Sequence, residues 1–285
     1  MSSPLIDINN LEIAFGGGSV RAVRGVSFSL GQEKLGIVGE SGSGKSTVGR
    51  AIMRLLPPTA IVSAERMSFR DVDLLKVDER KMMTIRGRRI GLILQDPKYS
   101  LNPVMRIGEQ IAETYRLHYP KASAKQAYGQ TLEMLEAVQI RDVERVARLY
   151  PHEISGGMGQ RVMIAMMLIA EPEVLIADEP TSALDVTVRL EILALLDELV
   201  ARRNLGLIFI SHDLNLVRNF CDRVLIMYAG RVVEVLEARD LDKARHPYTQ
   251  GLLASLPSID DPPARLPILK RDPSWLDGKI LERSR

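Results

Sequence analysis

The sequence predicts an α/β protein in which a mostly parallel sheet is flanked by helices. An antiparallel β subdomain, an inserted helical subdomain and a proline-rich C-terminal extension complete the predicted fold. Three observations carry this prediction. Short apolar strands alternate with helical patterns in the second half of the chain, residues 4–35 alternate apolar and polar side chains, and prolines recur after about residue 236. The 285 residues allow one large domain, or one domain with a smaller lobe.

The N-terminal region predicts antiparallel strands that lead into a parallel one. Residues 11–15 and 26–30 alternate in polarity, and glycines separate them. The apolar run 35–38 predicts a buried strand. A helical pattern starts at Val48 and is expected to continue to Leu56, where two prolines stop it.

Between that strand and that helix lies the most informative segment, which reads G-x-x-x-x-G-K-S. It consists of Gly39, Glu40, Ser41, Gly42, Ser43, Gly44, Lys45, Ser46 and Thr47. Its glycines let backbone N–H groups converge on an anion, while the helix N-terminus and Lys45 supply positive charge. The strand–loop–helix context favours a nucleotide-binding loop over a flexible Gly/Ser turn. The chain is therefore expected to have a P-loop NTPase core that binds a nucleoside triphosphate, with Lys45 on the β- and γ-phosphates and Ser46 on Mg²⁺.

The middle of the chain predicts a strand followed by a helical lobe. Residues 90–94 are strand-like and end at Gln95, and residues 107–149 have helical spacing. Pro151 and the turn at residues 155–157 close this lobe.

Strand–helix alternation then resumes. A strand at 174–177 ends in Asp178 and Glu179, a helix covers 186–202, and a strand at 207–210 is followed by His212. Residues 224–227 and 232–235 predict a hairpin. Because parallel strands place ligands at their carboxyl ends, these polar residues and the P-loop are expected to converge.

The acidic pair has a chemical interpretation beside a P-loop. Asp178 is expected to lie near the magnesium ion, and Glu179 is the natural general base for an attacking water. A strand-end acidic turn is the alternative.

Composition excludes several classes of protein. Lys+Arg 38 against Asp+Glu 36 gives a net charge of +2, too balanced to predict nucleic acid as the main partner. Cys221 is the single cysteine, so an internal disulfide and a cysteine-based metal site are excluded, and its apolar neighbours predict a buried thiol. With no signal pattern and no run of about 18–20 apolar residues, the chain is expected to be soluble and cytoplasmic, docking on a membrane protein at most.

The order of these motifs resembles that of the ATP-binding-cassette (ABC) ATPases. Gln95 stands at the Q-loop glutamine, residues 154–158 resemble the signature, 182–185 the D-loop, and His212 the switch histidine. The resemblance implies catalytic roles for Gln95, Glu179 and His212. It further implies metal contacts from Ser46, Gln95 and Asp178, and nucleotide contacts from Phe15, Ser155, Gly156, Gly157 and Asp185.

Some of these residues have simpler interpretations. Phe15 is also a candidate core residue, and His212 a surface histidine at a strand end. Ser182 and Asp185 have the spacing of a capping box for the following helix.

In this family the signature of one subunit faces the P-loop of another. The resemblance therefore implies that a lone chain is incomplete and hydrolyses ATP well only in a head-to-tail pair. Met158 stands where the family most often has glutamine, but that position supplies no phosphate-facing group.

Three segments are similar to importers of dipeptides, oligopeptides, nickel and related solutes: residues 95–103, residues 155–165, in which Gly159 replaces the usual arginine, and residues 246–253. The resemblance implies a second ATPase subunit, homologous or identical, two membrane permeases and, indirectly, an extracytoplasmic substrate-binding protein. It places the chain at the cytoplasmic face of the inner membrane, with an ATPase domain at 1–236, an inserted helical subdomain at about 96–155, and an extension at 237–285. Since Cys221 is the single cysteine, the iron–sulfur centre of many relatives is expected to be absent.

Three alternatives remain: a soluble cassette ATPase acting on ribosomes or DNA, an exporter ATPase, and a subunit that binds nucleotide without hydrolysing it. The first is disfavoured because such proteins usually have two cassettes in one chain or a long coiled-coil insertion, and this sequence has neither. The last is disfavoured by the intact Lys45, Gln95, Glu179 and His212.

Overall fold

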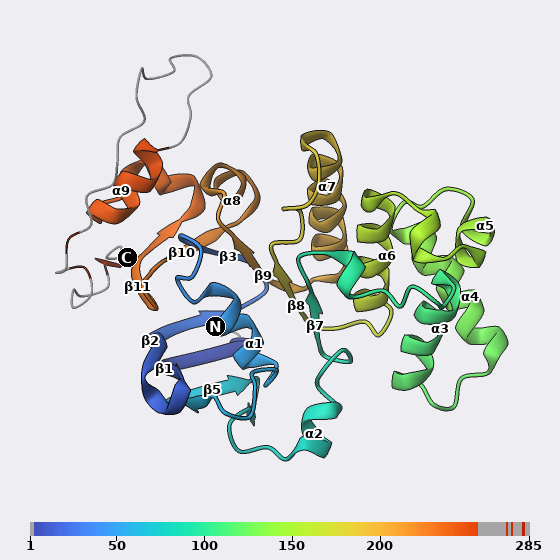
Figure 1. The fold of residues 1–285 in the computed structure, drawn as a ribbon, viewed down its shortest axis with the longest axis horizontal. Helices are drawn as coiled ribbons and strands as arrows, with labels where there is room; N and C mark the ends of the chain where they lie inside the picture. Colours follow the sequence, from blue (N-terminus) through green and yellow to red (C-terminus); the bar gives the residue numbers. More distant parts are fainter. Residues whose placement is uncertain (1–2, 256–271, 273–274, 276–280, 283–285) are drawn as a thin grey trace. The chain divides into compact units, whose positions relative to one another are not determined.

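A computed structural model describes residues 3–255, 272, 275 and 281–282 (Figure 1). It divides the chain into two compact units, Met1–Val77 with Ile208–Arg285, and Asp78–Leu207. Both contain helices and strands, as the α/β prediction requires.

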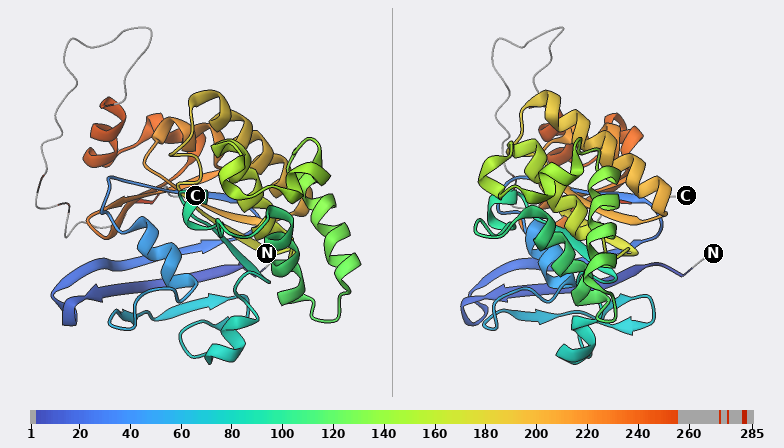
Figure 2. Two further views of the ribbon diagram at one scale, coloured as in Figure 1. Left: turned by 45° about the vertical axis from the view of Figure 1, so that its right-hand side comes forward. Right: turned by 90° about the vertical axis from the view of Figure 1, so that its right-hand side faces the viewer.

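The first unit contains an antiparallel sheet in the order β2-β1-β5-β6, with β4 (Ile61–Ser63) also paired to β1. Its long strands β1 (Ile6–Phe15) and β2 (Val20–Leu30) lie side by side (Figure 2), and β5 (Arg66–Phe69) and β6 (Val72–Asp73) extend it. Alternate side chains of β1 are buried on either side of a register shift between Ile8 and Leu11, namely Ile6 and Ile8 before it and Leu11 and Ile13 after it. The predicted antiparallel subdomain is confirmed.

The same unit contains strands in the order β12-β11-β10-β3. β3 (Lys34–Val38) runs parallel to β10 (Arg223–Tyr228), which pairs antiparallel with β11 (Arg231–Glu237), and β11 pairs with β12 (Leu281–Glu282). Ala229 (φ 45°) and Gly230 (φ 85°) form the tight turn of the predicted hairpin.

Helix α1 (Lys45–Ile52) ends four residues before Leu56, so the predicted length is wrong. Arg54 adopts φ 49°, its N–H bonds Ala51 O (2.9 Å), and the Leu55 N–H bonds Arg50 O (2.9 Å). These bonds satisfy the last carbonyls of the helix in a Schellman motif, which ends it before the prolines. Helix α8 (Leu214–Phe220) precedes Cys221, whose predicted burial is confirmed at 9% exposure. Burial raises the pKa of this thiol.

The extended tail expected after about Leu236 is wrong for the first part of that segment. A 3₁₀ turn (Ala238–Lys243) and helix α9 (Pro247–Ala254) follow β11. Pro247 occupies the first turn of α9, where a missing N–H costs no hydrogen bond. The later prolines 257, 262, 263, 267 and 273 lie outside the described residues.

The second unit holds the helical segment predicted at 107–149. The unit begins with α2 (Glu79–Met83) and β7 (Ile90–Ile93). The predicted helical segment then forms α3 (Ile107–His118), α4 (Ala124–Ala137) and α5 (Val143–Arg148). These three helices and α6 (Gly156–Leu168) pack against one another, as the green elements of Figure 1 show.

Strand β8 (Val174–Asp178) pairs parallel with β7 and is buried along its whole length. Such a strand is covered on both faces, which its continuous apolar run predicts. Helix α7 (Val186–Arg203) follows, and β9 (Gly206–Ser211) carries the chain out of this unit.

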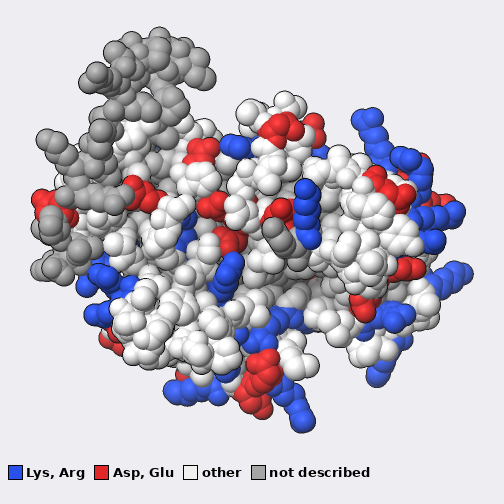
Figure 3. Space-filling model, in the orientation of Figure 1, with Lys and Arg blue, Asp and Glu red and all other residues white. Residues whose placement is uncertain are grey.

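Charge is mixed on the face that Figure 3 shows, where lysine and arginine side chains lie among aspartates and glutamates. Within the described part of the chain, no helix is both long and apolar enough to cross a membrane.

Candidate nucleotide site

The P-loop joins β3 to α1 in the first unit, as predicted. Gly42 (φ 80°) and Gly44 (φ 99°) adopt left-handed backbone conformations that side chains disfavour. Gly44 is also the N-cap of α1, so the helix begins directly at Lys45. The loop therefore needs glycine at these two positions for conformational reasons.

Close neighbours hold this loop on two sides. A Cβ atom on Gly39 would lie 2.1 Å from the Met227 carbonyl oxygen in β10, and one on Gly44 would lie 2.6 Å from the Ala22 oxygen in β2. The Gly230 N–H of the hairpin turn donates to Ser43 O (3.0 Å). The backbone of β2, of β10 and of the hairpin turn after β10 therefore fixes the position of the P-loop, although β10 and its turn lie far from the loop in sequence.

The polar groups of the loop fit an anionic ligand. Lys45 is 5% exposed, and its ammonium donates to the carbonyls of Gly39 (2.7 Å) and Glu40 (2.9 Å). The buried Ser43 hydroxyl has no hydrogen-bond partner among the described residues, and the N–H groups of Gly42 and Gly44 donate to none of them. A phosphate would satisfy these donors at a helix N-terminus.

Two further predicted residues belong to the same unit. Phe15 is the last residue of β1, paired with Val20, and is half-buried. His212 follows β9 and is exposed, between Ser211, whose hydroxyl accepts from the Asp213 N–H (3.0 Å), and Asp213, which caps α8. Adenine stacking by Phe15 and phosphate sensing by His212 stay predictions.

The second unit brings the predicted Q-loop glutamine and general base together. Asp178 ends β8 and is 6% exposed, and Glu179 follows it directly. Gln95, after β7, donates from Nε2 to the Glu179 carboxylate (3.4 Å). Neighbouring parallel strands therefore deliver these side chains to one place.

Glu179 has an uncommon backbone conformation, with φ 49°. A left-handed residue other than glycine costs on the order of 1 kcal/mol, and such residues cluster at functional sites. Ser182 stabilises the conformation, because its N–H (3.2 Å) and its hydroxyl (3.1 Å) both donate to Glu179 O. The capping box expected from Ser182 is wrong. Asp185 itself caps α7 and accepts from the Val188 N–H (3.0 Å).

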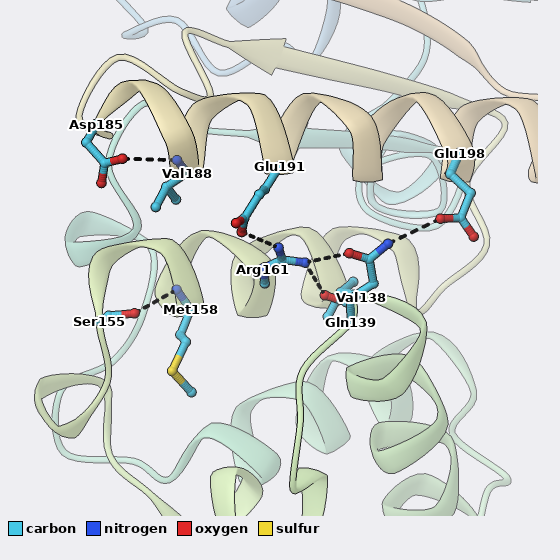
Figure 4. Close-up of polar contacts among 9 residues, drawn as sticks. All are labelled: Val138, Gln139, Ser155, Met158, Arg161, Asp185, Val188, Glu191 and Glu198. Carbon is cyan, nitrogen blue, oxygen red and sulfur yellow. Dashed lines mark hydrogen bonds and ion pairs between the residues drawn. The ribbon is translucent and has the colours of Figure 1, made fainter.

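The signature residues begin helix α6 (Figure 4). The Ser155 oxygen caps the helix by accepting from the Met158 N–H (3.3 Å), and the residue is exposed. Gly157 faces helix α7, where a Cβ atom would lie 2.7 Å from Val188 Cγ1. Glycine at 157 thus lets the signature helix lie close to the helix that the D-loop begins.

Arg161 ties the same helices together, a role that the sequence analysis did not assign. Its guanidinium donates to Glu191 of α7 (3.1 Å), to Val138 O (3.0 Å) and to the Gln139 side chain (3.2 Å) (Figure 4). The side chain is only 12% exposed. The position of Arg161 in the second turn of the signature helix was the one signal in the sequence that could have pointed to this residue. Its partners could not be read from the sequence, because they lie 22 to 30 residues away.

We expect Arg161→Ala to lower the free energy of unfolding by about 1–3 kcal/mol, because the carbonyl of the buried residue Val138 loses a charged donor and the mostly buried Arg161 side chain also loses its bonds to the exposed Gln139 and Glu191. Arg202→Ala is the matched control. Arg202 is 56% exposed and lies 4.0 Å from Glu198 on the same helix, so its loss is expected to cost less than about 0.5 kcal/mol. Denaturant unfolding followed by circular dichroism measures both, and equal losses would contradict the assignment.

The predicted residues thus fall into two groups. The first unit holds the P-loop, Phe15 and His212, and the second holds Gln95, Asp178, Glu179, the signature and Asp185. Convergence of both groups on one nucleotide stays a prediction. No group of three or more His, Cys, Asp or Glu side chains suited to a metal occurs among the described residues.

Comparison with known proteins agrees with this arrangement of motifs. A sequence profile of the family described as "ABC transporter" matches residues 23–182. The oligopeptide transport ATP-binding protein OppD of Bacillus subtilis is 47% identical over 261 residues, 90% of this chain and 73% of its own length. The dipeptide transport ATP-binding protein DppD of the same organism is 46% identical, over 90% of this chain and 78% of its own.

Solved structures agree as well. The ATP-binding cassette MJ0796, in a dimeric post-hydrolysis state bound to ADP and Pi, matches with a TM-score of 0.70 at 28% identity, covering 82% of this chain and 99% of that one. CbiO1 of Clostridium perfringens, part of the ABC transporter complex cbiONQ, matches with a TM-score of 0.74 at 26% identity, over 85% and 92% of the two chains. The family that the motif order indicated is therefore confirmed, and this chain belongs to the ATP-binding proteins of the ABC transporter family.

Proposed function

We propose that this chain is the ATP-hydrolysing subunit of an ABC importer that takes up peptides or a related small solute. The observation that carries the proposal is its similarity to oligopeptide and dipeptide transport ATP-binding proteins over 90% of its length. The P-loop geometry and the Gln95–Glu179 hydrogen bond supply the chemistry that such a protein needs.

The proposed reaction is attack of water on the γ-phosphorus of ATP. Glu179 accepts a proton from that water, a new P–O bond forms, and the bond between the γ-phosphorus and the bridging oxygen of ADP breaks. Gln95 orients the Glu179 carboxylate, Lys45 pairs with the β- and γ-phosphates, and His212 contacts the γ-phosphate. Phe15 stacks on the adenine.

The oxygen donors Ser46, Gln95 and Asp178 would hold Mg²⁺. This donor set fits, because Mg²⁺ prefers oxygen ligands and Asp178 presents a carboxylate at the end of a buried strand. When bound, the ion neutralises charge on the phosphates.

The exposed signature serves a second ATPase subunit in this proposal. Ser155, Gly156 and Gly157 present a hydroxyl and a helix N-terminus to the nucleotide bound by that partner, and Asp185 lies at the same shared site. Two transmembrane permeases complete the importer, and the substrate-binding protein is an indirect partner. This chain lies peripherally at the cytoplasmic face of the inner membrane. The ATPase domain would span 1–236, its helical subdomain about 96–155, and the extension 237–285.

Co-purification from the native membrane, followed by mass spectrometry, tests the partner class. We expect permeases and a second ATPase, whereas ribosomal or DNA-repair proteins would overturn the proposal.

The rate of ATP hydrolysis tests the shared site. The purified chain alone is expected to turn over slowly, and addition of its partner ATPase is expected to accelerate phosphate release roughly 100-fold, the effect of completing a set of anion donors. Phosphate release is measured over a dilution series of the chain. Full activity from a strict monomer would contradict the model.

A further inference from the structure

The C-terminal helix α9 reaches the phosphate-binding loop within the first unit. Tyr248, in the first turn of α9, is fully buried, and its hydroxyl oxygen accepts a hydrogen bond from the Glu40 backbone N–H (3.1 Å). The two residues are 208 positions apart in sequence. No role for Tyr248 follows from the P-loop motif itself.

This hydrogen bond acts on the peptide unit that also holds Lys45. The Glu40 N–H and the Gly39 carbonyl belong to one planar trans peptide, so they point in opposite directions. Tyr248 binds the N–H end, and the Lys45 ammonium binds the carbonyl end at 2.7 Å. Because hydrogen bonds in a chain polarise one another, the tyrosine strengthens the acceptor that positions the lysine.

Tyr248 is itself held rigidly. The buried carboxylate of Glu234, in β11, accepts from the backbone N–H groups of Arg245 (2.7 Å) and His246 (3.3 Å). The imidazole Nδ1 of His246 then accepts from the Tyr248 N–H (3.1 Å). Burial lowers the pKa of His246, which favours the neutral ring that this acceptor role needs.

Aromatic packing fixes the ring as well. The ring of Tyr228, at the end of β10, lies 4.6 Å from that of Tyr248, and the Trp275 ring lies 6.1 Å away, centroid to centroid. The hydroxyl of Tyr248 therefore points at the P-loop from a site with little freedom to move.

We propose that Tyr248 is a positioning residue of the nucleotide site, through which the C-terminal extension holds the Gly39–Glu40 peptide and Lys45 in their phosphate-binding arrangement. The inference rests on the proposed function, since it assumes that this loop binds ATP. Its consequence is that affinity for the nucleotide depends on a segment outside the matched family profile, which ends at residue 182.

Tyr248→Phe tests the proposal, because it keeps the buried ring and removes only the hydroxyl. The full chain is titrated with a fluorescent ATP analogue, and KM and kcat for ATP are measured. We expect the Kd and the KM to rise roughly three- to tenfold, the usual effect of one hydrogen bond, with kcat nearly unchanged. Amide hydrogen exchange of the peptide containing Glu40 is expected to become faster.

Tyr228→Phe is the matched control. It removes a phenol hydroxyl from the neighbouring ring, for which no hydrogen bond to the loop exists among the described residues, and it is expected to leave the Kd and the exchange rate as in the wild type. Glu234→Gln weakens the support of the turn before α9 without touching the P-loop, so a smaller rise in the Kd is expected.

The outcomes separate this inference from the proposed function. Wild-type Kd and exchange in Tyr248→Phe, together with weakened binding in Lys45→Ala, would overturn the role of Tyr248 and leave the ATP site intact. Wild-type binding in Lys45→Ala would overturn both. If Tyr248→Phe does not fold, the Glu234→Gln variant decides, and an unchanged Kd there contradicts the proposal.

Discussion

Glu179→Gln is expected to lower the rate of ATP hydrolysis by about 10²- to 10⁴-fold while leaving ATP binding intact. The amide has nearly the shape of the carboxylate but cannot accept the proton of the attacking water. Gln95 would still find an oxygen acceptor at position 179, so the local structure is expected to persist. Phosphate release under saturating ATP measures the loss, and the Kd for a fluorescent ATP analogue measures what remains.

Glu171→Gln is a matched control for that variant. Glu171 belongs to the same unit, is exposed, and also has a left-handed backbone, with φ 55° against 49° for Glu179. The same chemical change at a comparable backbone position is expected to leave turnover unaltered. Wild-type turnover in Glu179→Gln would remove Glu179 from the role of general base.

Lys45→Ala is expected to weaken ATP binding by roughly 10- to 100-fold, and hydrolysis at low ATP concentration by at least as much. The buried ammonium is the full positive charge of the loop, and its loss also leaves the Gly39 and Glu40 carbonyls without their donor. Isothermal titration with ATP measures the change directly. The free protein should remain folded, which circular dichroism checks.

Lys34→Ala controls for the loss of a lysine in the same segment. Lys34 begins β3, at the opposite end of the strand from the P-loop, and its ammonium lies 5.2 Å from the centre of the Phe220 ring. ATP affinity is expected to stay within about twofold of the wild type. The cation–π contact contributes about 0.5–1 kcal/mol to the stability of the fold, and it involves no group of the phosphate-binding loop. Equal losses in the two variants would show that Lys45 acts through folding.

Local patterns were sufficient for most elements. Alternating polarity predicted β1 and β2, because a strand buried on one face alternates apolar and polar side chains. Continuous apolar runs predicted β3, β8 and β9, because a strand buried on both faces is apolar throughout. The hairpin between β10 and β11 was readable from Ala229 and Gly230. The end of helix α1 was predicted wrongly. The helix stops before Arg54, which has a left-handed backbone, and not at the prolines that follow, because local sequence encodes the exact end of a helix only weakly.

The tail shows a different limit. Its prolines suggested an extended chain, yet Pro247 begins a helix because the first turn tolerates a missing N–H. The partners that stabilise this helix, such as Glu234 and Tyr228, lie elsewhere in the sequence.

The sequence by itself determined the family and the identity of the candidate site residues, because phosphate binding and water activation demand particular residue types in a fixed order. Tertiary structure alone decided how those residues are held. It placed Gln95 against Glu179, gave Ser182 to the Glu179 carbonyl rather than to a helix cap, and joined α6 to α7 through Arg161. It also set Tyr248 against the P-loop across 208 residues. Hydrogen bonds between segments distant in the chain leave no periodic trace in the sequence, so only the folded chain reveals them.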